Sequence, residues 1–169
     1  MRLPVYRGDV PTPALIRRAD LGDAQALADV HATAWREAYA GLVPESVLVD
    51  RASRGLARWQ EMLADPIGTT HWIALRAGSA VGFAWGHAAG PGHPRPLELQ
   101  GLYVLAGEYG VGLGQRLLDI TIGDAPCFLW VARDNPRAVA FYRRNGFGPD
   151  GGEQAVQAWG GLPLVRMVR

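Results

Sequence analysis

The sequence LELQGLYVLAGEYGVGLGQRLL, residues 97–118, carries the strongest structural signal in this 169-residue chain. The apolar run Leu97–Leu105 predicts a strand. Gly110, Gly112 and Gly114 then follow at every second position, and a helical pattern begins directly after them. A glycine-rich turn between a strand and a helix lets several backbone N–H groups converge on an anion, and the helix N-terminus adds partial positive charge. This stretch therefore predicts a phosphate or pyrophosphate site, and with it a nucleotide-containing cofactor.

Two other nucleotide-binding motifs with glycine-rich turns do not fit this stretch. A P-loop needs a lysine after its glycines, but Gly114 is followed by Gln115 and Arg116, and all 17 basic residues of the chain are arginine. The absence of lysine also excludes Schiff-base chemistry on a lysine side chain. A dinucleotide-binding fingerprint needs a third glycine where this chain has Gln115 or Leu117. Two alternatives remain: another kind of pyrophosphate turn, or glycines that serve only a tight turn and close helix packing.

The length and composition indicate one domain in a reducing compartment. A chain of 169 residues, 49% hydrophobic and 20% charged, fills one core and is too short for two ordinary domains. Its net charge of +1 gives no basis for a nucleic-acid surface. The single Cys127 excludes an internal disulfide, and the chain shows neither a signal-peptide pattern nor an apolar run of membrane-spanning length. We therefore expect a cytoplasmic protein that binds neither nucleic acid nor a membrane.

The hydrophobic periodicity predicts elements in the order β-α-α-β-β-β-α-β-α-β-β, after an extended lead-in over residues 1–13. This order is typical of an α/β domain with a mixed sheet and helices on both faces. The expected strands are 14–18, 71–76, 81–87, 97–105, 127–131, 154–159 and 162–168. The expected helices begin at Asp20 or Asp23, at Pro44 (with Leu48, Leu56, Trp59 and Leu63 along one side), after the glycine turn, and at Asn135.

Two blocks of the sequence carry a family resemblance. ELQGLYV at residues 98–104 is followed by YGVGLGQRLL at residues 109–118, which is similar to a pyrophosphate motif written Q/R-x-x-G-x-G/A. DNPRAVAFYRRNGF at residues 134–147 is similar to the segment N-x-x-A-x-x-F-Y-x-x-x-G-F. Together these blocks resemble the GNAT superfamily, the Gcn5-related N-acetyltransferases that use acetyl-CoA. The resemblance implies one domain over residues 14–169, with a central, mostly antiparallel, twisted sheet.

The resemblance also implies a binding site for acetyl-CoA, with CoA as the product. The backbone of Leu102, Tyr103 and Val104 would pair with the pantetheine arm, and core packing also explains the apolar residues of this strand. Asn135 would cap the following helix and contact the cofactor. Tyr109 departs from the family pattern, which commonly has Gln or Arg at this position. The backbone amides expected around the pyrophosphate are those of Tyr109, Gly110, Val111, Gly112, Leu113, Gly114 and Gln115.

Tyr142 and Glu98 are the expected catalytic residues. The Tyr142 phenol would protonate the departing thiolate, and the alternative is a core aromatic beside Phe141. Glu98 would accept the proton of an ammonium substrate through water. Its alternative role is that of a structural carboxylate paired with an arginine, because an unpaired carboxylate in an apolar strand is costly. His87 is the second candidate for the base.

Aromatic residues early in the chain lie where family members place the acceptor substrate. Trp35 and Tyr39 are four residues apart and share one face of the expected helix. Either they line the wall of a substrate pocket, or they form a hydrophobic pair that holds the helix in position. Trp85 and His87, at the end of a later strand, are expected to face the same cleft.

These features predict an acetyl-CoA-dependent N-acetyltransferase that acts on a primary amine of a small molecule or peptide by direct attack in a ternary complex. Cys127 lies in an expected buried strand, away from any base, which argues against an acyl-cysteine intermediate. No cluster of His, Cys and carboxylates has metal-ligand spacing, so we expect no metal. The alternative function is a non-catalytic acyl-CoA-binding or sensing module of the same fold. Exposed strand edges are compatible with a homodimer.

Overall fold

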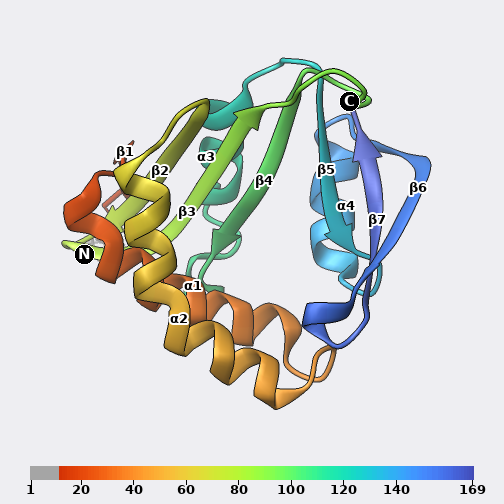
Figure 1. The fold of residues 1–169 in the computed structure, drawn as a ribbon. Helices are drawn as coiled ribbons and strands as arrows, with labels where there is room; N and C mark the ends of the chain where they lie inside the picture. The colour runs from red at the N-terminus through yellow and green to blue at the C-terminus, as the bar shows by residue number, and fades with distance from the viewer. Residues whose placement is uncertain (1–11) are drawn as a thin grey trace, which may run out of the picture.

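Seven β-strands form one sheet in the computed structural model, which describes residues 12–169 (Figure 1). The strand order is β1-β2-β3-β4-β5-β7-β6, and only β4 and β5 run parallel. The strands are β1 Leu15–Arg18, β2 Thr69–Arg76, β3 Ser79–Ala88, β4 Leu97–Val104, β5 Cys127–Ala132, β6 Gly148–Val156 and β7 Leu162–Val168. The helices are α1 Ala24–Tyr39, α2 Glu45–Ala64, α3 Leu113–Ile122 and α4 Pro136–Arg144, with short 3-10 turns η1 Leu21–Asp23, η2 Ala106–Glu108 and η3 Gln157–Trp159.

This architecture confirms the predicted element order and the mixed, mostly antiparallel sheet. Residues 1–11 of the predicted lead-in lie outside the described residues. Within residues 12–169, no helix is both long enough and apolar enough to cross a membrane.

The two faces of the sheet are covered by different helices. Because side chains alternate along a strand, Ile73 and Phe83 pack toward α1 and α2, where they meet Trp59. Their neighbours Ala74 and Ala84 pack on the opposite face, toward α3. Helices α1 and α2 therefore cover one face and α3 and α4 the other (Figure 1). This arrangement confirms the prediction of helices on both faces.

Strands β4 and β5 pair over only a short length. The parallel register joins Leu97–Leu99 to Cys127–Leu129. Beyond this point β4 continues beside β3 to Val104, whereas β5 continues beside β7 to Ala132. The two strands therefore separate toward their carboxyl ends. The β4 backbone that faces β5 along this stretch has no strand partner.

A β-bulge lies on β4 where the separation begins. Trp85 of β3 pairs with Gly101 and Gly86 pairs with Leu99, so that Gln100 is the extra residue. Glycine is required at position 101 because a Cβ there would overlap the Trp85 ring. The bulge thus redirects the backbone of β4 at the opening between the two strands.

The strand predicted over 154–159 is misplaced. The observed β6 begins at Gly148 and ends at Val156, and Trp159 lies in η3. Glycine and proline near the start of β6 are poor strand formers, so the sequence shows no strand signal in this segment. Pairing with β7 nevertheless extends along it, with an irregularity in the register between Pro149 and Glu153. Tertiary pairing therefore overrides the local propensity.

The first two helices differ from the prediction only in detail. Leu56 of α2 is 37% exposed and not part of the buried side, because the neighbouring Gly55 is the residue that packs against α1. Asp20 and Asp23 act together at the start of the first helical region. Asp20 accepts a hydrogen bond from the Gly22 N–H at 2.8 Å, and Asp23 accepts one from the Asp20 N–H at 2.9 Å.

Candidate active site

The glycine-rich turn leads directly into α3 and determines how the first backbone N–H groups of this helix are presented. Gly110 (φ 79°) and Gly112 (φ 78°) have left-handed backbone conformations that favour glycine. The first helical hydrogen bond runs from the Arg116 N–H to the Gly112 carbonyl at 3.1 Å, so the N–H groups of the first turn have no helical acceptor. These donors and the helix dipole favour an anion at this end of α3.

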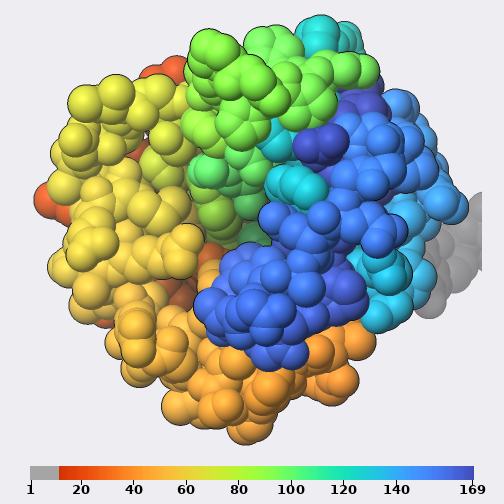
Figure 2. Space-filling model, turned by 45° about the vertical axis from the view of Figure 1, so that its right-hand side comes forward, coloured from red at the N-terminus to blue at the C-terminus, as the bar shows by residue number. Residues whose placement is uncertain are grey.

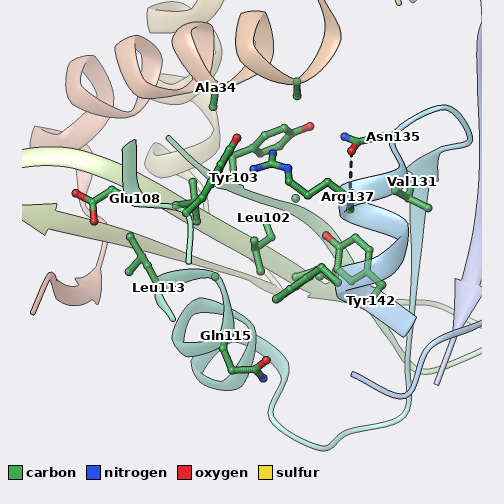
Figure 3. A pocket seen from close by; sticks show the side chains of 18 of the residues that line it. Ala34, Leu102, Tyr103, Glu108, Leu113, Gln115, Val131, Asn135, Arg137 and Tyr142 are labelled. Atoms are coloured by element: carbon green, nitrogen blue, oxygen red, sulfur yellow. Dashed lines mark hydrogen bonds between the residues drawn. The ribbon is translucent and has the colours of Figure 1, made fainter. Parts of the chain in front are cut away.

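A cavity of about 380 Å³ lies over this turn, between β4 and α4 (Figure 3). It extends along the unpaired edge of β4 and reaches Ala34 of α1 on the far side of the strand opening. Val111 is the one predicted cofactor residue outside its lining, and this residue is 51% exposed. The predicted cofactor residues that line the cavity are Leu102, Tyr103, Val104, Tyr109, Gly110, Gly112, Leu113, Gly114, Gln115, Asn135 and Tyr142.

Tyr142 projects from α4 into this cavity (Figure 3). Its ring makes edge contacts with Phe141 and Phe147, with centroid distances of 5.3 and 5.7 Å, and the residue is buried. Burial raises the pKa of the Tyr142 phenol, which therefore stays protonated at neutral pH. Tyr142 is thus a core aromatic whose protonated phenol lines the cavity, and its role as a proton donor stays a prediction. The α4 N-terminus is held in place by Asn135, whose Oδ1 accepts a hydrogen bond from the Ala138 N–H at 3.1 Å.

A second cavity, of about 510 Å³, opens on the α1–α2 side of the sheet. Figure 2 shows the hollow at the centre of this face, bounded by the yellow segments of α2 and β2 and by the blue C-terminal strands. We call it the acceptor cavity because it includes Trp35, Tyr39 and Trp85, for which the sequence predicts contact with an acceptor substrate. Tyr39, Leu99, Gln100, Tyr103 and Trp130 line both cavities. The two cavities therefore meet where β4 and β5 separate.

Aromatic side chains form a hydrogen-bonded wall of the acceptor cavity. The Trp35 Nε1–H donates to the Tyr103 hydroxyl at 3.0 Å, and the Tyr103 and Tyr39 hydroxyls lie 3.4 Å apart. The Trp85 Nε1–H donates to the Gln100 side-chain oxygen at 3.0 Å. Trp35 and Tyr39 are buried, and their rings pack together with centroids 4.6 Å apart. Both also line this cavity, and their role toward a substrate stays a prediction.

Glu98 lines the acceptor cavity with only 17% of its side chain exposed. Its carboxylate oxygen lies 3.7 Å from the His87 Nδ1, and within residues 12–169 no arginine pairs with it. The alternative of a structural pair with arginine therefore does not hold. Burial raises the pKa of the Glu98 carboxyl, an effect partly opposed by His87 and His93. His87 lies beside Glu98 but is not part of the cavity lining.

Several cavity residues carry no recognisable signal in the sequence. The Arg137 guanidinium lies 3.4 Å from the Tyr109 ring centroid, across the mouth of the first cavity. Arg51, Trp130 and Trp159 line the acceptor cavity from α2, β5 and η3. These residues come from segments far apart in the chain, and only the folded structure brings them together.

Cys127 is placed as expected, in the interior of β5. Its side chain is fully buried, and burial raises the pKa of the thiol to about 11. A thiol that stays protonated is a poor nucleophile, which argues against an acyl-cysteine. Within the described part of the chain, no three His, Cys, Asp or Glu side chains are grouped so that they could hold a metal ion.

Comparison with known proteins gives a consistent set of matches. A sequence model of the acetyltransferase (GNAT) family matches residues 27–147. A Mycobacterium tuberculosis protein named as a probable N-acetyltransferase is 28% identical over 149 residues, which cover 83% of each protein. The PaiA N-acetyltransferase of Thermoplasma acidophilum, solved with coenzyme A, superposes with a TM-score of 0.73 at 20% identity, over 90% of this chain and 97% of the other. The ribosomal-protein-alanine N-acetyltransferase of Brucella melitensis has a TM-score of 0.66 at 28% identity, with 92% and 98% coverage.

Proposed function

The chain belongs to the acetyltransferase (GNAT) family, and we propose that it transfers the acetyl group of acetyl-CoA to a primary amine of a small molecule or peptide. The observation that carries the proposal is the meeting of two cavities where β4 and β5 separate, with Tyr142 beside the junction. One cavity has the donors for a phosphorylated cofactor. The other has an aromatic wall and a buried carboxylate suited to an amine.

The residues of the first cavity fit an acyl-CoA donor. The N–H groups at the start of α3 suit the pyrophosphate. The unpaired edge of β4 at Leu102, Tyr103 and Val104 offers backbone groups to the amides of the pantetheine arm, as an added strand would. Coenzyme A on the Thermoplasma relative of the same fold supports this assignment.

Three groups of this chain would act on the reacting atoms. Glu98 accepts the proton of the substrate ammonium through water, which frees the amine to attack the acetyl carbonyl. A backbone N–H between Leu102 and Val104 stabilises the developing oxyanion. Tyr142 donates its proton to the thiolate as the carbon–sulfur bond breaks. The attacking nitrogen loses its second proton to the resulting phenolate, so that the new amide, a neutral thiol and the restored phenol are the products. Direct transfer in a ternary complex is favoured because Cys127 is buried and protonated.

A non-catalytic acyl-CoA-binding or sensing module is the second candidate function, favoured by Tyr109 at the usual Gln or Arg position. It differs from the first candidate in one observable, the release of thiol in the presence of amines.

A calorimetric titration with acetyl-CoA, CoA and NADH comes first. We expect micromolar binding of acetyl-CoA and CoA and none of NADH, followed by thiol release in an amine screen. If neither CoA nor acetyl-CoA binds, both candidate functions are wrong. If acetyl-CoA binds but no amine releases thiol, the non-catalytic sensing module is the function that remains.

Arg137 is expected to supply the phosphate contact that Tyr109 lacks. The Arg137→Gln variant should bind acetyl-CoA about 10-fold more weakly, because a charge-assisted hydrogen bond contributes about 1.5–3 kcal/mol and solvent exposure lowers this figure. S-acetylpantetheine has no pyrophosphate, so its binding should be unchanged. Arg143→Gln, an exposed change on the same helix and outside the cavity lining, is the matched control. Equal losses for both ligands would instead indicate a distorted cavity.

A further inference from the structure

Arg51 of α2 places its guanidinium in the acceptor cavity between two tryptophans. Its Cζ lies 3.6 Å from the Trp35 ring centroid and 5.2 Å from that of Trp159. The stacked guanidinium is thereby held in one plane, and its edge remains available for hydrogen bonds. The Arg51 Nη2 lies 3.5 Å from the His31 Nε2.

Within the described chain, no carboxylate forms an ion pair with Arg51. Six other arginines form ion pairs, namely Arg17, Arg36, Arg54, Arg76, Arg133 and Arg166. Asp50, next to Arg51 in sequence, is paired with Arg54 at 2.8 Å. A histidine supplies no negative charge in either protonation state, and burial lowers the pKa of His31 to about 3, so its ring is neutral. A half-buried guanidinium without an anionic partner is costly unless a ligand completes it.

The acceptor cavity is lined by charged groups of both signs. Arg51 and Arg58 come from α2, Asp65 follows the end of α2, and Glu98 comes from β4 of the sheet. Glu98 suits the ammonium group that is to be acetylated. The Arg51 guanidinium suits a second, anionic group of the same molecule, and its planar edge matches a carboxylate. The aromatic side chains between them suit an apolar body.

We propose that the acceptor is an amine that also carries a carboxylate, and that Arg51 binds this carboxylate in the acceptor cavity. This inference rests on the proposed acetyl transfer and adds the chemical class of the acceptor. Arg58, which is exposed at the same cavity, adds positive charge without being the main contact. Arg51 thus favours acceptors that have a carboxylate, whereas Glu98 and Tyr142 accept and donate the protons of the reaction.

Matched amine pairs that differ only by a carboxylate test the inference. Aromatic amino acids are compared with their decarboxylated amines, and ω-amino acids of graded length with alkylamines, by thiol release from acetyl-CoA. We expect kcat/KM to favour the best carboxylated member by at least about 10-fold, as one charge-assisted contact allows. This ratio should collapse in Arg51→Gln, recover in part in Arg51→Lys, and persist in Arg54→Gln. Arg54 is the control because it lies on the same helix, paired with Asp50.

Two outcomes separate this inference from the proposed function. Preference for the neutral amines, or a carboxylate preference that survives in Arg51→Gln, would overturn the Arg51 assignment while acetyl transfer stands. If acetyl-CoA binds but no amine is acetylated, the proposed acetyl transfer fails. The Arg51 site is then tested by the binding of the carboxylated amines themselves. Tryptophan fluorescence then reports on the cavity, which Trp35, Trp85, Trp130 and Trp159 line. Saturable quenching by the same carboxylates that is lost in Arg51→Gln supports the site, and no response overturns it.

Discussion

Replacement of Tyr142 by phenylalanine is expected to lower kcat by about 10²- to 10³-fold, within the range for the loss of a general acid. The ring would remain packed between Phe141 and Phe147, so the KM for acetyl-CoA and the melting temperature should change little. The effect is confined to kcat because the phenol acts on the leaving thiolate and not on binding. Steady-state thiol release with the best amine of the screen measures it.

A change of leaving group distinguishes proton donation by Tyr142 from a structural role. With an acetyl thioester whose thiol is more acidic than that of CoA, the departing thiolate needs less protonation, so the defect of Tyr142→Phe should shrink. A defect of the same size with both donors would indicate that the hydroxyl positions the substrate. Unchanged turnover in Tyr142→Phe would remove Tyr142 from the mechanism.

The Glu98→Gln variant is expected to lower kcat/KM by about 100-fold at neutral pH, as expected for loss of a general base. In the wild type, kcat/KM should rise with pH as Glu98 loses its proton. Because burial raises the pKa of Glu98, the midpoint of this rise in kcat/KM should lie above pH 4.5, the ordinary carboxyl pKa. The rise should be absent in Glu98→Gln. If the rise came from the substrate ammonium instead, its midpoint would move with an amine of different pKa, whereas a midpoint set by Glu98 would not.

Stability should respond to the same substitution in the opposite direction. The pKa of Glu98 is higher in the folded than in the unfolded chain, so the folded state binds more protons. The folded protein therefore loses stability as the pH rises from the unfolded-state pKa of Glu98 through its folded-state pKa. At neutral pH, Glu98→Gln should therefore melt no lower than the wild type. Glu45→Gln, which alters an exposed carboxylate paired with Arg36, controls for loss of charge. A less active and less stable Glu98→Gln protein would point to a structural role.

Much of the fold was predictable because its signals are local. The glycine turn, the helix start at Asn135 and the strands with regular apolar runs all appear where periodicity and capping place them. Strand β6 did not appear where expected, since its glycine-rich beginning is paired only through contact with β7. The carboxylate Glu98 could be nominated from its setting in an apolar strand. Its partner His87 lies on the neighbouring strand, and only the sheet register brings the two side chains together.

The sequence by itself determined the helices, most of the strands, the order of the elements and the family resemblance, and it predicted an anion site, because each of these depends on residues close together in the chain. Only the tertiary structure decided how the acceptor cavity is built. Its wall combines Arg51 of α2, Trp85 of β3, Trp130 of β5 and Trp159 of η3. The separation of β4 from β5 that joins it to the first cavity depends on which strands pair. Burial, charge compensation and strand register are properties of contacts between distant segments, which local patterns do not specify.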